Sequence, residues 1–198
     1  MTTYAADPAL TLAAARDEYF RVNDFGLDGG YQAAWVDFKL GPIPMPFPNT
    51  RGRRAAVRFH DLHHTLTGYG TDVLGEFEIS AWEIGSGCAG FVAAWQLDLS
   101  GMVGGLLSIP RRTWRAYLRG RQSRNLFRAR YDHALLSRQV GEMRHQLGLD
   151  RPLYPARAGD VGFFVAATVA GLAVGLMMMA LMVPVAIVSN LAALVRRR

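Results

Sequence analysis

Apolar residues recur at helical spacing through most of the first 150 positions of the chain. The pattern predicts an amphipathic helix over residues 10–20 and a second helix around the apolar positions of 57–66. Residues 71–99 are more evenly apolar and fit one or two helices interrupted at Gly85–Gly87. Residues 131–149 fit a closing helix. The periodicity therefore predicts a helical domain.

Two stretches precede the second helix, and only the first of them fits a helix. Tyr31 to Phe38 fits a further short helix. The run from Pro42 to Pro48 cannot be regular helix, because each proline removes a backbone donor and biases the preceding residue toward extended geometry. We expect this run to be a rigid connector, with a polyproline ligand for a partner as the alternative.

The C-terminal part of the chain is one long apolar run. No charged residue occurs in the 35 positions from Val161 to Val195, whereas about 20 apolar residues in a helix cross a bilayer core. We expect Pro184 to kink this helix, since the whole run of about 50 Å exceeds one untilted crossing. A buried helix in a soluble dimer is the alternative. The predicted fold is all-α, with a compact helical metal-binding domain over residues 1–158 and a C-terminal membrane-anchoring helix over residues 159–198.

Composition narrows the possible partners. The net charge of +6 rests on arginine, and eight arginines lie among residues 111–130, interleaved with aromatic residues. Because no base-reading motif accompanies them and an apolar tail follows, we expect contact with anionic lipid headgroups and no nucleic acid. A solvated helix face is the alternative. Cys88, the single cysteine, excludes an internal disulfide.

The tail and the charges together predict where the protein lies. We expect a single-pass anchor in the inner (cytoplasmic) membrane with the domain on the cytoplasmic side, because arginines precede the tail and no export signal is seen at the N-terminus.

Ala167, Gly171 and Gly175 form a stripe of small residues at helical spacing. Such stripes pack membrane helices together, so we expect a homodimer.

The candidate chemistry lies between residues 60 and 76. His60 and His64 share a helix face, and Asp61 is offset from them by one position. Gly68 then ends the helix, and a returning helix would bring Glu76 back toward the histidines. Two imidazoles and nearby carboxylates are what a divalent cation requires, so we predict a metal site of His60, Asp61, His64 and Glu76. Glu83, two turns beyond Glu76, is a candidate to support it.

Other interpretations of the histidines are less consistent with the sequence. A zinc protease of the His-Glu-x-x-His type needs a glutamate where Asp61 stands. His60-x-x-His63-His64 matches one histidine box of membrane di-iron hydroxylases, but that class uses about eight histidines and this chain has five. A histidine cluster satisfied by solvent or by the core remains the non-functional alternative.

The motif His60-Asp61-x-x-His64, eleven residues, then Glu76 resembles the metal motif of the coenzyme Q biosynthesis protein four family. Arg51 to Gly75 is similar to that family's basic run followed by HDLxHxLTGY and GE. Trp114 to Arg121 and Glu142 to Leu149 are similar to its closing segment. The resemblance covers most of residues 15–150, and the apolar tail departs from the family's usual form.

This resemblance implies ubiquinone biosynthesis on a prenylated benzoate or quinone precursor at the membrane. The implied reaction is a metal-dependent oxidative decarboxylation at ring carbon one, with zinc as the first choice and iron, manganese or cobalt as alternatives. Arg58 would hold the substrate carboxylate, and His63 would support a ligand or transfer a proton. The alternative is a non-catalytic scaffold that binds isoprenoid lipid and organises other quinone-biosynthesis enzymes.

Overall fold

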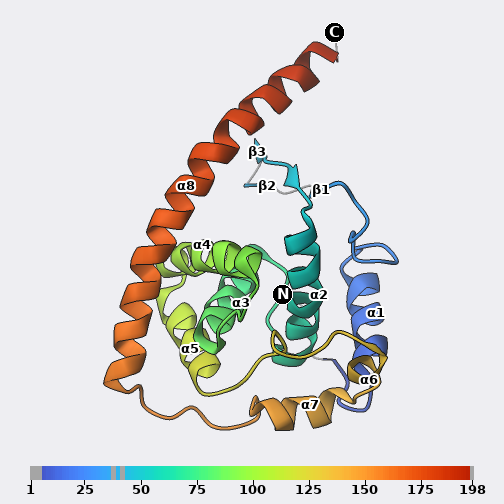
Figure 1. Cartoon of the computed structure of the whole chain (residues 1–198), viewed down its shortest axis with the longest axis vertical. Coiled ribbons are helices and arrows are strands. Elements are labelled where there is room, and N and C mark those ends of the chain that lie inside the picture. The colour runs from blue at the N-terminus through green and yellow to red at the C-terminus, as the bar shows by residue number, and fades with distance from the viewer. Residues whose placement is uncertain (1–5, 37–38, 41–42, 197–198) are drawn as a thin grey trace.

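The computed structural model describes residues 6–36, 39–40 and 43–196, and this part of the chain is almost entirely helical (Figure 1). The helices, in chain order, are α1 (Leu12–Val22), α2 (Arg51–Thr67), α3 (Val73–Ser86), α4 (Val92–Ser108), α5 (Pro110–Arg121), α6 (His133–Leu136), α7 (Val140–Leu147) and α8 (Ala158–Arg196). The predicted all-α class is confirmed.

Side chains that cap helix starts fix the boundaries of the helices near the candidate site. Thr50 accepts a hydrogen bond from the backbone of Arg53 at 3.2 Å, and α2 begins there. The same helix ends at Gly68, whose φ of +77° is a left-handed conformation that glycine adopts without steric cost. Asp72 then accepts from the backbone of Gly75 at 2.9 Å, so α3 starts only a few residues later.

The hydrophobic core draws on most of the helices, and α3 meets α5 within it. Here Trp82 and Tyr117 are fully buried. The two helices cross at a pair of glycines: a Cβ on Gly85 would lie 2.3 Å from the carbonyl of Tyr117, and a Cβ on Gly120 would lie 2.2 Å from that of Trp82. Only hydrogen in place of a side chain permits this approach.

Between α1 and α2 the chain first forms turns, including Tyr31, and then short strands, so the predicted helix over Tyr31–Phe38 is wrong for its described residues. Trp35–Val36 (β1) pairs antiparallel with Phe47–Pro48 (β4). Lys39–Leu40 (β2) pairs antiparallel with Ile43–Pro44 (β3). Residues 37–38 and 41–42 lie outside the described residues. The proline-rich run thus supplies one side of a short arm, consistent with the expected extended geometry.

The closing helix predicted over residues 131–149 is divided in two. Asp132 accepts from the backbone of Leu135 at 3.0 Å and starts the short α6. The chain then straightens at Gln139, which forms a β-bridge with Thr11, and α7 follows. The bridge needs an extended residue in the middle of the segment, which is why one continuous helix does not form.

Helix α8 is long and apolar enough to cross a membrane, as the sequence predicts. It runs without interruption through Pro184. Its first half packs along α4, and its second half extends beyond the domain toward β3 (Figure 1). There the side-chain amide of Asn190 donates to the carbonyl of Pro44 at 3.4 Å. The helix is therefore both a packing element of the domain and a candidate span.

The stripe of small residues on α8 faces its own chain. Ala167 is buried, and a Cβ on Gly171 would lie 2.6 Å from the carbonyl of Leu99 in α4. Gly175 lies near Ser100 of the same helix. We expected this stripe to pack two copies of the chain together. In the structure it packs against α4 of its own chain instead.

Candidate metal centre

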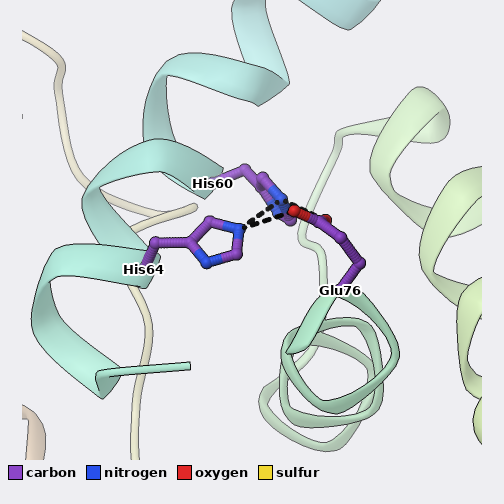
Figure 2. A group of neighbouring side chains, drawn as sticks. All are labelled: His60, His64 and Glu76. Atoms are coloured by element: carbon purple, nitrogen blue, oxygen red, sulfur yellow. Dashed lines mark hydrogen bonds and ion pairs between the residues drawn. The ribbon is translucent and has the colours of Figure 1, made fainter. Parts of the chain in front are cut away.

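Figure 2 shows His60 and His64 projecting from α2 toward Glu76 at the start of α3. The two histidines lie one helical turn apart. Glu76 faces them because the turn after Gly68 is tight: a Cβ on Gly75 would lie 2.2 Å from the carbonyl of Gly70. The turn therefore positions the carboxylate as well as reversing the chain.

The three side chains place their donor atoms at the spacing of a metal's ligands. The Nε2 atoms of His60 and His64 are 3.0 Å apart. Glu76 lies 3.3 Å from the Nε2 of His60 and 3.4 Å from that of His64. Bonds of about 2.0–2.1 Å in a tetrahedral zinc site put neighbouring ligand atoms roughly 3.3 Å apart. The donors of these three residues therefore fit a single divalent cation.

The other ring nitrogen of each histidine is held by an acceptor. Nδ1 of His64 donates to the carbonyl of Tyr69 at 3.0 Å. Nδ1 of His60 lies 3.2 Å from both carboxylate oxygens of Glu83. Metal-binding histidines characteristically direct one nitrogen to the metal and the other to a carbonyl or carboxylate. Both rings are thus oriented as ligands, and Glu83 takes the supporting position that its spacing predicts.

The carboxylates around His60 and His64 favour a positive charge in the cluster. Partial burial raises the pKa of Glu76, but the stronger effect of His64 and His60 lowers it to about 2. Burial lowers the pKa of His60, and the carboxylates of Glu83 and Glu76 outweigh this and raise the pKa well above its usual value. The carboxylates therefore favour positive charge between these side chains, whether a proton or a metal supplies it.

Access to the cluster is from the side of Glu76. The side chain of His64 is 1% exposed and that of His60 is 20% exposed, whereas that of Glu76 is 43% exposed. Three protein ligands with an accessible side are typical of catalytic zinc sites, in which a water or substrate completes the shell.

Asp61, the fourth predicted ligand, has a different partner. Its carboxylate accepts a hydrogen bond from the hydroxyl of Tyr31 at 2.5 Å. It lies outside the group formed by His60, His64 and Glu76, whose donor atoms are all within 4.8 Å of one another. Burial raises the pKa of Asp61. The structure therefore gives Asp61 a place beside the cluster, tied to the segment before α2.

His63 points into the core. Its ring lies between Trp82 and Phe127. Nδ1 lies 2.5 Å from Glu83, and Nε2 accepts the backbone N–H of Leu126 at 2.9 Å. Burial lowers the pKa of His63, consistent with a neutral ring. The link through Glu83 agrees with a supporting role for His63, whereas proton transfer would need a free ring nitrogen and both are engaged within the domain.

A second group of possible ligands lies deeper and is occupied by its own hydrogen bonds. It consists of His60, Glu83 and Asp98. Burial raises the pKa of Glu83, but His60 and His63 lower it well below its usual value. Burial and the charge of Glu83 raise the pKa of Asp98 well above its usual value. These opposite shifts favour a protonated Asp98 beside an ionised Glu83, and Glu83 in turn contacts the His60 ring. We therefore interpret His60, Glu83 and Asp98 as support for the first cluster.

Arg58, the predicted carboxylate-binding residue, is directed elsewhere. Its guanidinium lies 4.9 Å from the ring centroid of Tyr131. Residues two apart on a helix do not share a face, so Arg58 and His60 point in different directions.

Two arginines hold the C-terminal end of α2. The sequence had suggested no individual role for either. Arg144 donates to the carbonyls of Leu66 at 2.9 Å and Thr65 at 3.1 Å. Arg119 donates to the carbonyl of Thr67 at 3.0 Å. Cations at a helix C-terminus satisfy its unpaired carbonyls. These contacts fix the helix that carries both histidines. The sequence suggested lipid contact for the stretch that contains Arg119, and it placed Arg144 in the family's closing segment.

Other arginines of residues 111–130 also have protein partners. Arg112 pairs with Glu78, and Arg121 pairs with Asp160 at 2.9 Å. The arginine-rich stretch therefore contributes to the domain's own structure.

Comparison with protein-family models, curated proteins and solved structures found no match for this chain.

Proposed function

We propose that this protein carries out metal-dependent head-group chemistry on a prenylated benzoate or quinone precursor in ubiquinone biosynthesis. The observation that carries the proposal is the convergence of His60, His64 and Glu76 on a domain that bears a membrane-length apolar helix. The motif's resemblance to the coenzyme Q biosynthesis protein four family supplies the substrate class. A small polar ring with a long apolar chain matches a polar site held at a bilayer.

The proposed reaction is an oxidative decarboxylation at ring carbon one. The bond between the ring and its carboxyl carbon breaks, carbon dioxide leaves, and a hydroxyl takes its place. Dioxygen supplies one oxygen atom to the ring. A two-electron donor and two protons convert the other oxygen atom to water.

The residues of the chain divide the work of the site. His60, His64 and Glu76 would hold the metal, which when bound acts as a Lewis acid toward an oxygen of the substrate or co-substrate. Glu83 and the carbonyl of Tyr69 keep the two Nε2 atoms directed at the metal position. Glu76 is the most exposed of the three side chains, so the substrate ring would approach the metal from its side.

Helix α8 would anchor the domain in the inner membrane, with the domain on the cytoplasmic side. Arginines lie on both sides of the apolar run, with the larger number in the domain, and this distribution supports the orientation. Protease added to intact spheroplasts should leave the domain uncut, and digestion there would reverse the orientation.

The rival proposal is a scaffold without catalytic activity. A structural metal is normally enclosed by four protein ligands. The accessible side chain of Glu76 supports catalysis instead, because an open side admits an exchangeable ligand.

Turnover by the full chain in lipid nanodiscs tests the proposal. The substrate would be a prenylated hydroxybenzoate with metal, dioxygen and a reductant supplied, and mass spectrometry would follow loss of the carboxyl group. We expect Glu76→Gln to lower turnover by on the order of a hundredfold. Glu142→Gln, at an exposed ion pair with Arg138, is the matched control and should retain wild-type turnover. A metal-loaded wild type that binds substrate without converting it would support the scaffold.

A further inference from the structure

Arg53 contains the one buried side-chain nitrogen or oxygen without a hydrogen-bond partner among the residues that the structure describes. This atom is its Nε. It lies in the first turns of α2, seven residues before His60. Seven residues are two helical turns, so both side chains leave the same face of the helix. Burial lowers the pKa of Arg53, while Asp61, Tyr31 and Glu76 act in the opposite direction.

The guanidinium of Arg53 is held in place by its neighbours. Nη1 donates to the side-chain oxygen of Asn49 at 3.0 Å. Asn49 is itself buried and donates to the carbonyl of Ala33 at 2.9 Å. The guanidinium also lies 5.6 Å from the ring centroid of Phe47. These contacts orient the arginine but leave its Nε–H unpaired.

A positioned arginine with an unpaired buried donor is suited to an oxyanion. The planar guanidinium presents parallel N–H groups that match a carboxylate or phosphate. An unpaired buried donor is costly, and an incoming anion would satisfy it. Arg53 and His60 share this helix face and lie roughly 10 Å apart along the helix axis, so a single ligand of that length would contact both.

We propose that Arg53 forms an oxyanion-binding subsite beside the metal cluster and receives the carboxylate of an aromatic acid substrate. This inference rests on the proposed function for the identity of the acid. It gives Arg53 the role that the sequence suggested for Arg58. The same chemistry would also accept a phosphate, and the experiment separates the two anions.

Calorimetric titration of the full chain in detergent, with one equivalent of Zn²⁺, tests the subsite. The probes are 4-hydroxybenzoate, its uncharged analogue 4-hydroxybenzamide and inorganic phosphate. We expect wild type to bind the benzoate at least about tenfold more tightly than the amide. Arg53→Gln should remove this preference, and Arg53→Lys should restore part of it. Phosphate binding tighter than benzoate, and lost in Arg53→Gln, would support the subsite and assign it to a phosphorylated ligand.

The matched control is Arg58→Gln, on the same helix and directed at Tyr131, which should bind all three probes as wild type does. Circular dichroism and metal content establish that each variant is folded and loaded; if Arg53→Gln does not fold, Arg53→Lys decides the result. Equal binding of benzoate and amide by wild type, or an unchanged preference in a folded Arg53 variant, would overturn the subsite. Loss of the preference in a protein without turnover would leave the subsite standing and reject the proposed function.

Discussion

His60 connects the exposed and the buried halves of the site through its two ring nitrogens. Nε2 faces His64 and Glu76, and Nδ1 faces Glu83. Glu83 also contacts His63 and is fully buried, so its charge is compensated entirely within the domain. Burying a carboxylate is costly unless it is paired. The network behind His60 is therefore part of what fixes the ligand geometry.

Asp98 belongs to this network as a hydrogen-bond donor. The ability to donate a hydrogen bond at this position should therefore matter more for stability than the charge of the side chain. Burial and the charge of Glu83 raise the pKa of Asp98 well above its usual value, which favours the protonated carboxyl that can donate a hydrogen bond to Glu83. Asparagine can donate in the same place, so Asp98→Asn should change the free energy of unfolding by less than about 1 kcal/mol, whereas Asp98→Ala should lower it by about 1–3 kcal/mol. Urea titration followed by circular dichroism measures both.

Asp150→Asn, at an exposed position, serves as the control for the Asp98 variants and should leave stability unchanged. Equal losses in Asp98→Asn and Asp98→Ala would mean that Asp98 is ionised, contrary to this description of the network.

At the scale of elements, the turn between α2 and α3 decides whether Glu76 meets the histidines. The carbonyl of Gly70 occupies the space that a Cβ on Gly75 would need. Gly75→Ala should therefore displace the start of α3, lower the free energy of unfolding by about 1–3 kcal/mol and weaken metal binding by on the order of tenfold. Thermal unfolding and competition with a chelator measure the two effects.

Gly52 provides the matched control for that substitution. It lies in the first turn of α2, where a Cβ would approach no atom closer than Thr50 Oγ1 at 4.0 Å. Gly52→Ala should raise the free energy of unfolding by about 0.5–1 kcal/mol through helix propensity, with metal affinity unchanged. A Gly75→Ala variant that behaved like Gly52→Ala would contradict the importance of the turn.

Local signals in the sequence were sufficient for the central part of the site. The four-residue spacing of His60 and His64 and the glycine at position 68 are each read within one helix or turn. Together they predict two histidines facing a carboxylate on a returning helix, and the structure places His60, His64 and Glu76 in that arrangement.

Contacts between distant segments could not be read from the sequence. Tyr31 reaches Asp61 across 30 residues, and Arg144 reaches Leu66 across 78. The predicted helix at Tyr31 failed for the same reason, because pairing with β4 overrides local propensity. Arg58, which we expected at the substrate carboxylate, lies instead against Tyr131, a distant residue in the sequence. Tertiary packing, which no local pattern encodes, decided these features.

At the scale of the whole molecule, α8 couples the domain to its proposed membrane. The half of α8 that packs on α4 and the half that extends beyond it form one continuous helix (Figure 1). The outer face of the packed half also carries exposed apolar side chains, among them Val165, Val169 and Leu172. A lipid surface along this face would bring the domain, and therefore the cluster, close to the bilayer.

Separating α8 from α4 should loosen the domain without releasing the protein from membranes. Gly171→Leu places a side chain where the carbonyl of Leu99 lies 2.6 Å from a Cβ. We expect a melting temperature several degrees lower and unchanged sedimentation with membranes, since the apolar run is preserved. Gly162→Leu, where a Cβ would meet nothing within 4 Å, should leave both quantities unchanged. Equal melting temperatures for the two variants would contradict packing of α8 on α4.

The metal content of the purified full chain tests the central claim most directly. Elemental analysis after detergent purification and metal reconstitution would compare wild type, His60→Ala/His64→Ala and the control His133→Ala/His145→Ala, which removes two exposed histidines. We predict about one divalent metal ion per chain in wild type and in the control, and none in His60→Ala/His64→Ala while its circular dichroism stays helical. Wild type without metal, or equal metal in all three proteins, would contradict a metal centre at His60, His64 and Glu76.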